Sequence, residues 1–388
     1  MLPLRRFGML SVIGSITLMP LLVLPAMVGT LIDETTLTET QAGWSASLNF
    51  LGGAIIAGLM ALRMHRLDLS KVAAIGLLVA AIGDGLSGFS AGHAPVFLFV
   101  RFCTGVGAGA AYTAVLAAFA RLPDVDRGYA VFVTLQFTLS GLGLFLLPVF
   151  SQYLGASGMF LTIAALDVLG LLLCSKLPGR AVQSAAEQGA AARGRRTELH
   201  VLLAWTTILG ALGFLVFESA LVAQYTYIER VGVSLALTDQ QVGTALLIAS
   251  LAGIPGALSI VLLGARVGRM GGLSFGVAFA IAGLIIMISA GMISTVQFLP
   301  YVLGAGMISF AWAFCLPYIQ GLMAALDPHG SAAALGSASS TIGGAIGPGL
   351  AALVVGTGVY QHVMMFTIAL LLLALTSFFI ASRRVVRP

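Results

Sequence analysis

Charged side chains are scarce in this 388-residue sequence, at 9% of residues, whereas a soluble domain carries about 25%. Hydrophobic residues make up 59% of the chain. This composition excludes a soluble globular protein and an intrinsically disordered one. The sequence holds only three cysteines, Cys103, Cys174 and Cys315, and they fall in separate hydrophobic stretches. A disulfide-stapled secreted module is therefore excluded.

Motifs that bind cofactors or carry out catalysis are also missing from the sequence. It contains no G-x-x-x-x-G-K-[ST] phosphate loop, so the chain has no ATP-hydrolysing motor of its own. The five histidines make no H-E-x-x-H or other ligand cluster. We therefore expect no metal, no cofactor and no enzyme. The net charge of +5 is spread over short loops, which fits membrane topology better than nucleic-acid binding.

Long hydrophobic runs fill most of the chain, and its mean hydropathy is +1.05. A helix needs about 20 apolar residues to cross a bilayer. The runs predict twelve spans, at about 8–30, 43–62, 71–91, 95–119, 128–150, 156–176, 200–226, 239–263, 272–292, 297–323, 331–355 and 361–382. The expected protein is an all-α, multi-pass membrane protein.

The basic residues predict the orientation of these spans. With the N-terminus in the cytoplasm, all of the 19 Lys and Arg residues except Arg101 and Arg230 fall in cytoplasmic segments. Arg230 falls in an external loop and Arg101 within a span. This asymmetry predicts that both termini are cytoplasmic.

The two halves of the chain resemble each other. Arg63-x-x-Arg66 follows the second span and Arg266-x-x-Arg269 follows the eighth. Parallel repeats of this kind build transporters from two helical bundles with a site between them. The sequence predicts an N-terminal six-helix bundle at 1–176, a cytoplasmic linker at 177–199 and a C-terminal six-helix bundle at 200–388.

The loops after the second and eighth spans resemble the G-x-x-x-D-R-x-G-R loop of the major facilitator superfamily. Leu62 and Ala265 take the place of the acid, and His65 replaces the second glycine of the first loop. The matching residues, which the resemblance assigns to gating, are Gly58, Arg63 and Arg66 in the first half and Arg266, Gly268 and Arg269 in the second.

The fourth span carries Arg101-x-x-x-Gly105-x-Gly107-Ala108. It resembles the R-x-x-x-G-x-G-A motif of proton-coupled drug and metabolite transporters in that superfamily, whose arginine is implicated in proton transfer. The resemblance implies the major facilitator fold and a monomeric secondary transporter for a small molecule, working by alternating access. Its expected location is the cell (inner) membrane.

Four ionisable residues fall inside predicted spans: Asp84, Arg101, Asp167 and Glu218. Each costs at least about 2.5–3.5 kcal/mol at the centre of a lone helix, so we expect them to face a helix bundle or a wet cavity. Asp84 and Arg101 lie at similar depths and can pair across their helical hairpin, either as a structural or gating pair or as groups that take part directly in proton coupling. No basic residue in the other second-half spans can neutralise Glu218, which makes it the favoured proton-binding or cation-binding carboxylate. Asp167 is a weaker candidate that can instead face a helix interface.

One stripe of the fourth span has room for a ligand beside the guanidinium, which suits an organic anion. It is formed by Arg101, Thr104, Gly105, Ala108 and Tyr112. The other polar and aromatic residues that can line a substrate site are Asn49, Gln136, Tyr225, Tyr301, Trp312 and Tyr318. Aromatic residues in spans often serve only for packing.

The sequence leaves several functions open. The favoured one is proton-coupled transport, either export of drugs or metabolites or movement of an organic anion, by symport or antiport. Uniport also fits. A lipid-moving or channel-like pore would instead carry flux without proton coupling. A membrane-embedded enzyme would need a nucleophile–base pair or a metal cluster, and the sequence shows neither.

Overall fold

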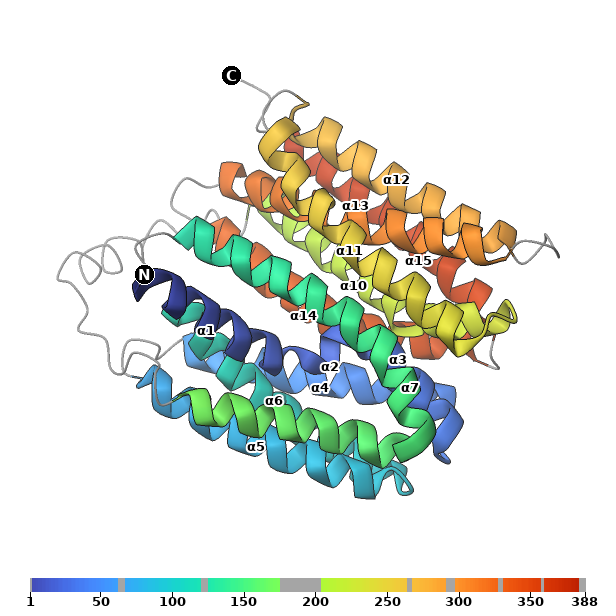
Figure 1. Ribbon diagram of the computed structural model, residues 1–388. Helices are drawn as coiled ribbons and strands as arrows, with labels where there is room; N and C mark the ends of the chain where they lie inside the picture. Colours follow the sequence, from blue (N-terminus) through green and yellow to red (C-terminus); the bar gives the residue numbers. More distant parts are fainter. Residues whose placement is uncertain are drawn as a thin grey trace.

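The described residues of the computed structural model form helices joined by short turns (Figure 1). These residues are 2–61, 67–119, 125–174, 204–263, 267–290, 297–326, 331–356 and 359–383. The helices are α1 (Leu2–Thr17), α2 (Met19–Leu22), α3 (Leu24–Glu34), α4 (Glu39–Ala61), α5 (Leu69–Ser90), α6 (Ala94–Phe119), α7 (Val125–Cys174), α10 (Trp205–Ser234), α11 (Asp239–Leu263), α12 (Arg269–Ala290), α13 (Phe298–Leu326), α14 (Ser331–Val355) and α15 (Tyr360–Ser382).

The first predicted span is a broken helix. Pro20 and Pro25 stand in the first turns of α2 and α3, and proline lacks the N–H that would continue the preceding helix. Leu18 and Val23 leave helical geometry at the two breaks, with ψ of 1° and 15°. The segment therefore changes direction within the hydrophobic run, which places backbone carbonyls where side chains of other helices can reach them.

The fifth and sixth predicted spans are joined directly within α7. A break inside this helix lies at Gly155, with φ of 61° and ψ of −169°. Glycine adopts this positive φ without a steric cost, because it has no Cβ. Two helical segments, before and after Gly155, therefore run in different directions with no loop between them.

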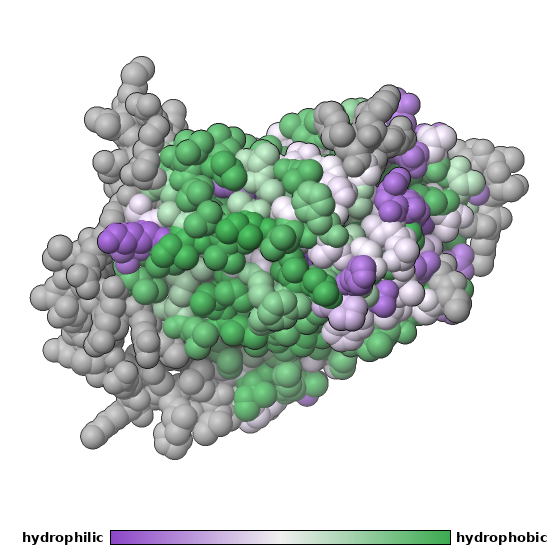
Figure 2. Space-filling model, turned by 90° about the horizontal axis from the view of Figure 1, so that it is seen from below, coloured by the Kyte–Doolittle hydropathy of each residue, from purple (hydrophilic) through white to green (hydrophobic). Residues whose placement is uncertain are grey.

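The exterior of the helices is suited to lipid. In the described part of the chain, ten helices are long and apolar enough to cross a membrane, and two shorter apolar helices lie at Gly8–Thr17 and Val131–Leu147. A broad band of hydrophobic residues covers the face shown in Figure 2, and hydrophilic residues gather toward the right of that view. The chain is therefore a multi-pass membrane protein.

The helices before residue 175 pack mainly against one another, and so do the helices after residue 204. The most extensive contacts between these groups are those of α4 with α14, α7 with α11, and α3 with α10. The predicted linker at 177–199 lies outside the described residues, as do Arg63, Arg66 and Arg266. The proposed bundle boundaries therefore stay a prediction.

Two loop-motif residues of the second half are described. Gly268 has a φ of 68° immediately before α12 begins at Arg269, so this position favours glycine for a backbone reason. Arg269 is exposed and reaches the neighbourhood of Gly321 on α13. In the first half, Gly58 lies on α4 with no neighbouring atom within 4 Å of a Cβ built there.

Glycines on α6 let two helices approach its backbone. A Cβ at Gly105 would overlap the backbone carbonyl of Asn49 on α4, and one at Gly107 would lie 2.6 Å from the carbonyl oxygen of Gly76 on α5. The room expected beside Gly105 for a ligand is therefore filled by the α4 backbone. This part of the R-x-x-x-G-x-G-A motif serves helix packing.

Gly105→Ala is expected to destabilise the protein by about 1–3 kcal/mol, because the new methyl group would push α4 and α6 apart. Gly85→Ala is the matched control, since a Cβ at Gly85 meets no atom within 4 Å. Thermal unfolding in detergent should show a lower Tm for Gly105→Ala alone. Equal Tm values for the two variants would contradict the packing argument.

Candidate functional site

Arg101 lies in a buried cluster within the first group of helices. Its Nη1 donates to the carboxylate of Asp84 on α5, and the two side chains are 0% and 1% exposed. Ser87 Oγ lies 3.4 Å from the same nitrogen, and the guanidinium carbon lies 5.2 Å from the centre of the Phe160 ring. The predicted pairing across the helical hairpin is therefore present, and the guanidinium contacts α5 and the second segment of α7.

Asp167 completes this cluster from the second segment of α7. It is 2% exposed and is a hydrogen-bonding neighbour of Asp84. Its Oδ2 and the Nε and Nη2 of Arg101 have no hydrogen-bond partner among the described residues. One guanidinium and two carboxyl groups are electrically neutral when the cluster holds one proton. The arrangement can therefore bind and release a proton at Asp84 or Asp167.

Asn49 supports the backbone of this cluster from α4. Its Nδ2 donates to the backbone oxygen of Arg101 at 3.0 Å, and its side chain is buried. This contact positions α6 relative to α4. It leaves no free amide facing a solute in this conformation.

Glu218 on α10 forms a second buried site, in the other group of helices. It is 6% exposed, and the side chains of Trp312 on α13 and Ser340 on α14 are its polar neighbours. The Trp312 indole N–H can only donate, so it can serve as a donor to the Glu218 carboxyl group. No basic side chain pairs with Glu218 within the described ranges. A buried carboxylate without a cation is costly, so the site suits a proton or another positive charge.

Tyr225 links this site to the first group of helices. Its ring meets Trp312 edge-on, with 5.9 Å between ring centres. Its hydroxyl donates to the backbone oxygen of Leu22 at 2.9 Å, and Ser140 Oγ donates to the same oxygen at 2.7 Å. Leu22 ends α2, so the break in the first helix supplies the shared acceptor. Ser250 of α11 lies 3.5 Å from Ser140.

The structure brings Glu218, Tyr225 and Trp312 together from the predicted set of lining residues but leaves the others elsewhere. Tyr301 is buried and donates to the backbone oxygen of Ile228 at 2.8 Å. Tyr318 packs on Gly272 of α12. Tyr112 is half-buried beside Phe132, and Gln136 is half-buried on the first segment of α7.

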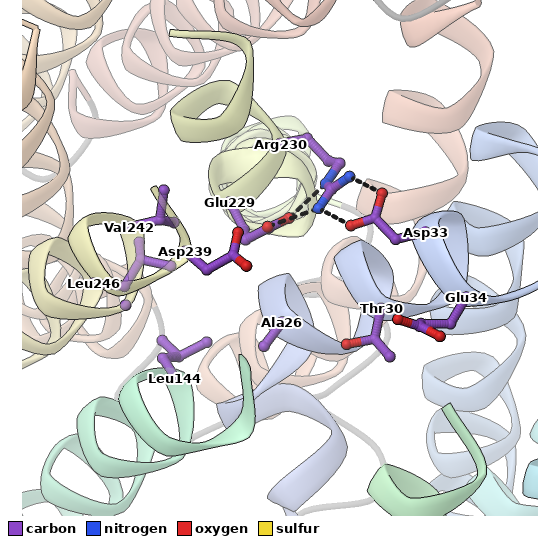
Figure 3. A pocket seen from close by; sticks show the side chains of 11 residues that line it. Ala26, Thr30, Asp33, Glu34, Leu144, Glu229, Arg230, Asp239, Val242 and Leu246 are labelled. Carbon is purple, nitrogen blue, oxygen red and sulfur yellow. Dashed lines mark hydrogen bonds and ion pairs between the residues drawn. The ribbon is translucent and has the colours of Figure 1, made fainter. Parts of the chain in front are cut away.

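Arg230 corrects a prediction from the sequence. It was expected in an external loop, but α10 continues to Ser234 and buries most of its side chain. The guanidinium donates to both oxygens of Asp33 on α3, each at 2.7 Å, and to both oxygens of Glu229. These charge-assisted bonds stabilise the added helical turns. Figure 3 shows Arg230 held between the two acids.

A small pocket adjoins this ion-pair cluster. Asp33, Glu34 and Thr30 lie on one side of it, Glu229 and Asp239 on another, and Leu144, Val242 and Leu246 provide apolar walls (Figure 3). No sequence pattern connects Asp33 with Glu229 and Arg230. The sequence indicates only that Arg230 is unusual, because it is the one basic residue in a predicted external loop.

The two groups of helices are fastened at one end of the molecule, which we call the distal end because it lies away from the first residues of α1. Tyr227 donates to the backbone oxygen of Glu39 at 2.8 Å, and Tyr360 donates to its Oε1 at 2.9 Å. Thr40 donates to the oxygen of Ala352. In the described ranges, the hydrogen bonds between the groups all lie from this end to the level of Leu22 and Ser140. The distal end is therefore closed.

Comparisons with known proteins give one family and one fold. The family model described as Major Facilitator Superfamily matches residues 7–348. A solved structure described as a D-xylose-proton symporter has a TM-score of 0.71 and 15% sequence identity, and the alignment covers 95% of this chain and 96% of that chain. No curated protein matches the sequence.

Asp84→Asn is expected to destabilise the protein by about 3–5 kcal/mol, because it leaves the Arg101 charge buried without its partner. Asp167→Asn is the matched control. It removes a carboxyl group that does not pair directly with the guanidinium, so we expect a loss below about 1 kcal/mol. Thermal unfolding in detergent measures both. A Tm for Asp84→Asn as high as that of Asp167→Asn would be evidence against this arrangement.

Arg230→Gln is expected to open the distal end, because it removes the Asp33 pair and leaves Glu229 without its cation. The reporter is a cysteine placed at the buried pocket residue Ala26, in a variant lacking the three native cysteines. Its labelling by a membrane-impermeant maleimide should accelerate roughly tenfold, equivalent to about 1.4 kcal/mol. Lys71→Gln, at the opposite end of the molecule, should not change the rate. Unchanged labelling in Arg230→Gln would show that the cluster does not hold this end closed.

Proposed function

This chain belongs to the major facilitator superfamily of transporters, and from that premise we propose that it moves a small organic solute by proton-coupled alternating access. Two helical bundles, at 1–176 and 200–388, would rock about a site between them. The likeness to the D-xylose-proton symporter supports the fold alone at 15% identity. Its sugar is therefore not assigned to this chain.

The proposal includes twelve membrane crossings. Ten described helices have sufficient length and hydropathy. The broken helix α1–α3 would supply the first crossing and the segment of α7 before Gly155 the fifth. The distribution of Lys and Arg supports cytoplasmic termini and places the distal end outside the cell. The closed distal end then corresponds to an inward-facing conformation of a monomer in the cell inner membrane.

One observation carries the proposed coupling: Glu218 is a buried carboxyl group without a cation, and only the side chain of Trp312 separates it from Tyr225, which bonds to the other bundle. Trp312 connects it to Tyr225, whose hydroxyl bonds to Leu22 in the other bundle. We call this contact of Tyr225 with Leu22 the joint between the bundles. Gain or loss of a proton at Glu218 changes the charge beside it. A change in the charge of Glu218 can therefore alter the stability of the closed distal end.

The Asp84–Arg101–Asp167 cluster is the second proton-binding candidate. It lies among α5, α6 and the second segment of α7, so it does not contact the interface between the bundles directly. A proton there would change the packing within the N-terminal bundle, through α6 and its Asn49 contact with α4. We assign it a supporting role in coupling, with Glu218 as the carboxyl group that acts at the interface.

The direct test is transport by purified protein in liposomes containing a pH-sensitive dye, with a panel of candidate solutes. Glu218→Gln removes the titrating group but keeps its size, so proton movement coupled to solute should fall at least tenfold. Asp68→Asn is the matched control, because Asp68 caps α5 at its N-terminus and asparagine serves equally well there. Its coupled transport should remain unchanged.

The outcomes separate the alternatives. Solute flux in the wild-type protein without accompanying protons would indicate a uniporter or a channel-like or lipid-moving pore. Normal proton coupling in Glu218→Gln would show that another group carries the proton. Loss of coupled proton movement in Glu218→Gln, while the variant remains folded, supports the proposed mechanism.

A further inference from the structure

We propose that the transported solute is an organic cation with an apolar body, which binds Glu218 beside Trp312 and Tyr225 in competition with the proton. This inference rests on the proposed function and adds the chemical class of the solute. It is carried by the distribution of unpaired charge, by the aromatic side chains around Glu218 and by the space next to them.

The two buried guanidinium groups of the described residues, those of Arg101 and Arg230, are already neutralised. Arg101 is fully buried and paired with Asp84, with Asp167 beside it. Arg230 is held by Glu229 and Asp33. Neither guanidinium faces the joint between the bundles with its charge unmatched. An anionic solute would therefore find no counter-charge at this level in the part of the chain that the structure describes.

Glu218 has the opposite arrangement. Its polar neighbours are Trp312 and Ser340, two neutral side chains that leave its negative charge uncompensated. A quaternary or protonated amine would supply that charge. The nearby rings of Trp312 and Tyr225 would attract the same group, because the face of an aromatic ring carries negative partial charge. The apolar body of the solute would lie against these rings.

The residues around Glu218 leave room on the side of the joint. Trp312, Tyr225, Ser340 and Gly344 are all half-buried, whereas Glu218 behind them is buried. A Cβ built at Gly344 meets no atom nearer than 4.0 Å, the distance to Val222 Cγ2. Tyr225, one of these half-buried residues, bonds to Leu22 in the other group of helices. A solute entering this space would lie between the bundles.

No other charged group shares this position on the helices that pack against α10. Helices α13 and α14 carry no charged residue within their bounds. The acids on α3 and α11 and the histidine on α15 lie at helix ends: Asp33, Glu34, Asp239 and His362. Arg230 on α10 itself is twelve residues away, or about 18 Å along the helix. Glu218 is therefore the one group there that a bound cation and a proton would both require.

The test uses tetraphenylphosphonium, whose permanent charge does not change with pH, and tetraphenylborate, an anion of the same shape. Binding to the purified full-length protein in detergent is measured by equilibrium dialysis across a range of pH. We expect the cation to bind at least tenfold more tightly than the anion and to bind more tightly as pH rises, because protons leave Glu218. Glu218→Gln should lose at least tenfold in cation affinity and lose the pH dependence.

Matched variants separate binding from folding. Glu218→Asp keeps the charge and should retain pH-dependent binding, which verifies that the site is intact. Trp312→Phe should weaken cation binding several-fold, whereas Trp205→Phe, at the exposed start of α10, should not change it. Gly344→Val should weaken binding of tetraphenylphosphonium more than that of tetramethylammonium, because the added side chain fills the space needed by the larger cation.

The inference is overturned if folded wild-type protein does not bind the cation, if it binds the anion equally well, or if Glu218→Gln binds the cation normally. Its failure can be distinguished from failure of the proposed function. Proton-coupled transport of only neutral or anionic solutes would reject the cation and retain the transporter. Cation binding at Glu218 without proton movement in liposomes would support the site and reject the coupling.

Discussion

Neutralisation of buried charge is the constraint on which this structure depends. An ion in a low-dielectric interior is tolerated only with a partner of opposite charge, with hydrogen bonds, or after gaining or losing a proton. Arg101 and Arg230 meet this requirement through carboxylates on neighbouring helices. Glu218 meets it only partly, through two neutral side chains. The fold therefore fixes two of its charges and leaves a third dependent on what binds there, which is the property a coupled transporter needs.

The three charged sites occupy different positions relative to the moving parts. The Arg101 cluster lies inside the N-terminal group of helices, where it stabilises α5, α6 and α7 against one another. The Arg230 cluster bridges α3 and α10 at the distal end. Glu218 lies on α10 and is connected by Trp312 and Tyr225 to the joint at Leu22. Separate groups of side chains thus stabilise the N-terminal helices, hold the distal end closed and provide the proposed ligand site.

The extent to which the sequence predicts this arrangement depends on how far apart the partners lie in the chain. Asp84 and Arg101 occupy adjacent helices joined by a short turn, so equal depth was sufficient to pair them. Asp33 and Arg230 are 197 residues apart in different halves, and no local pattern relates them. The position of Asp167 was also uncertain, because its helix is apolar on every side and hydrophobic periodicity does not define its inward face. The sequence also predicted an unbroken first span, since a hydrophobic run alone does not reveal where its helix breaks or which carbonyls the break presents to other helices.

The joint at Leu22 has a consequence for genetics. Its acceptor is a main-chain oxygen, which every amino acid possesses, so exchange of the Leu22 side chain leaves the acceptor in place. Tyr225 and Ser140 both reach this oxygen and lie 3.1 Å apart, so each keeps the Leu22 oxygen as its acceptor when the other is lost. A screen of single substitutions would under-report this contact. Replacement of the amide that contains it by an ester, or paired changes at both donors, would reveal its contribution.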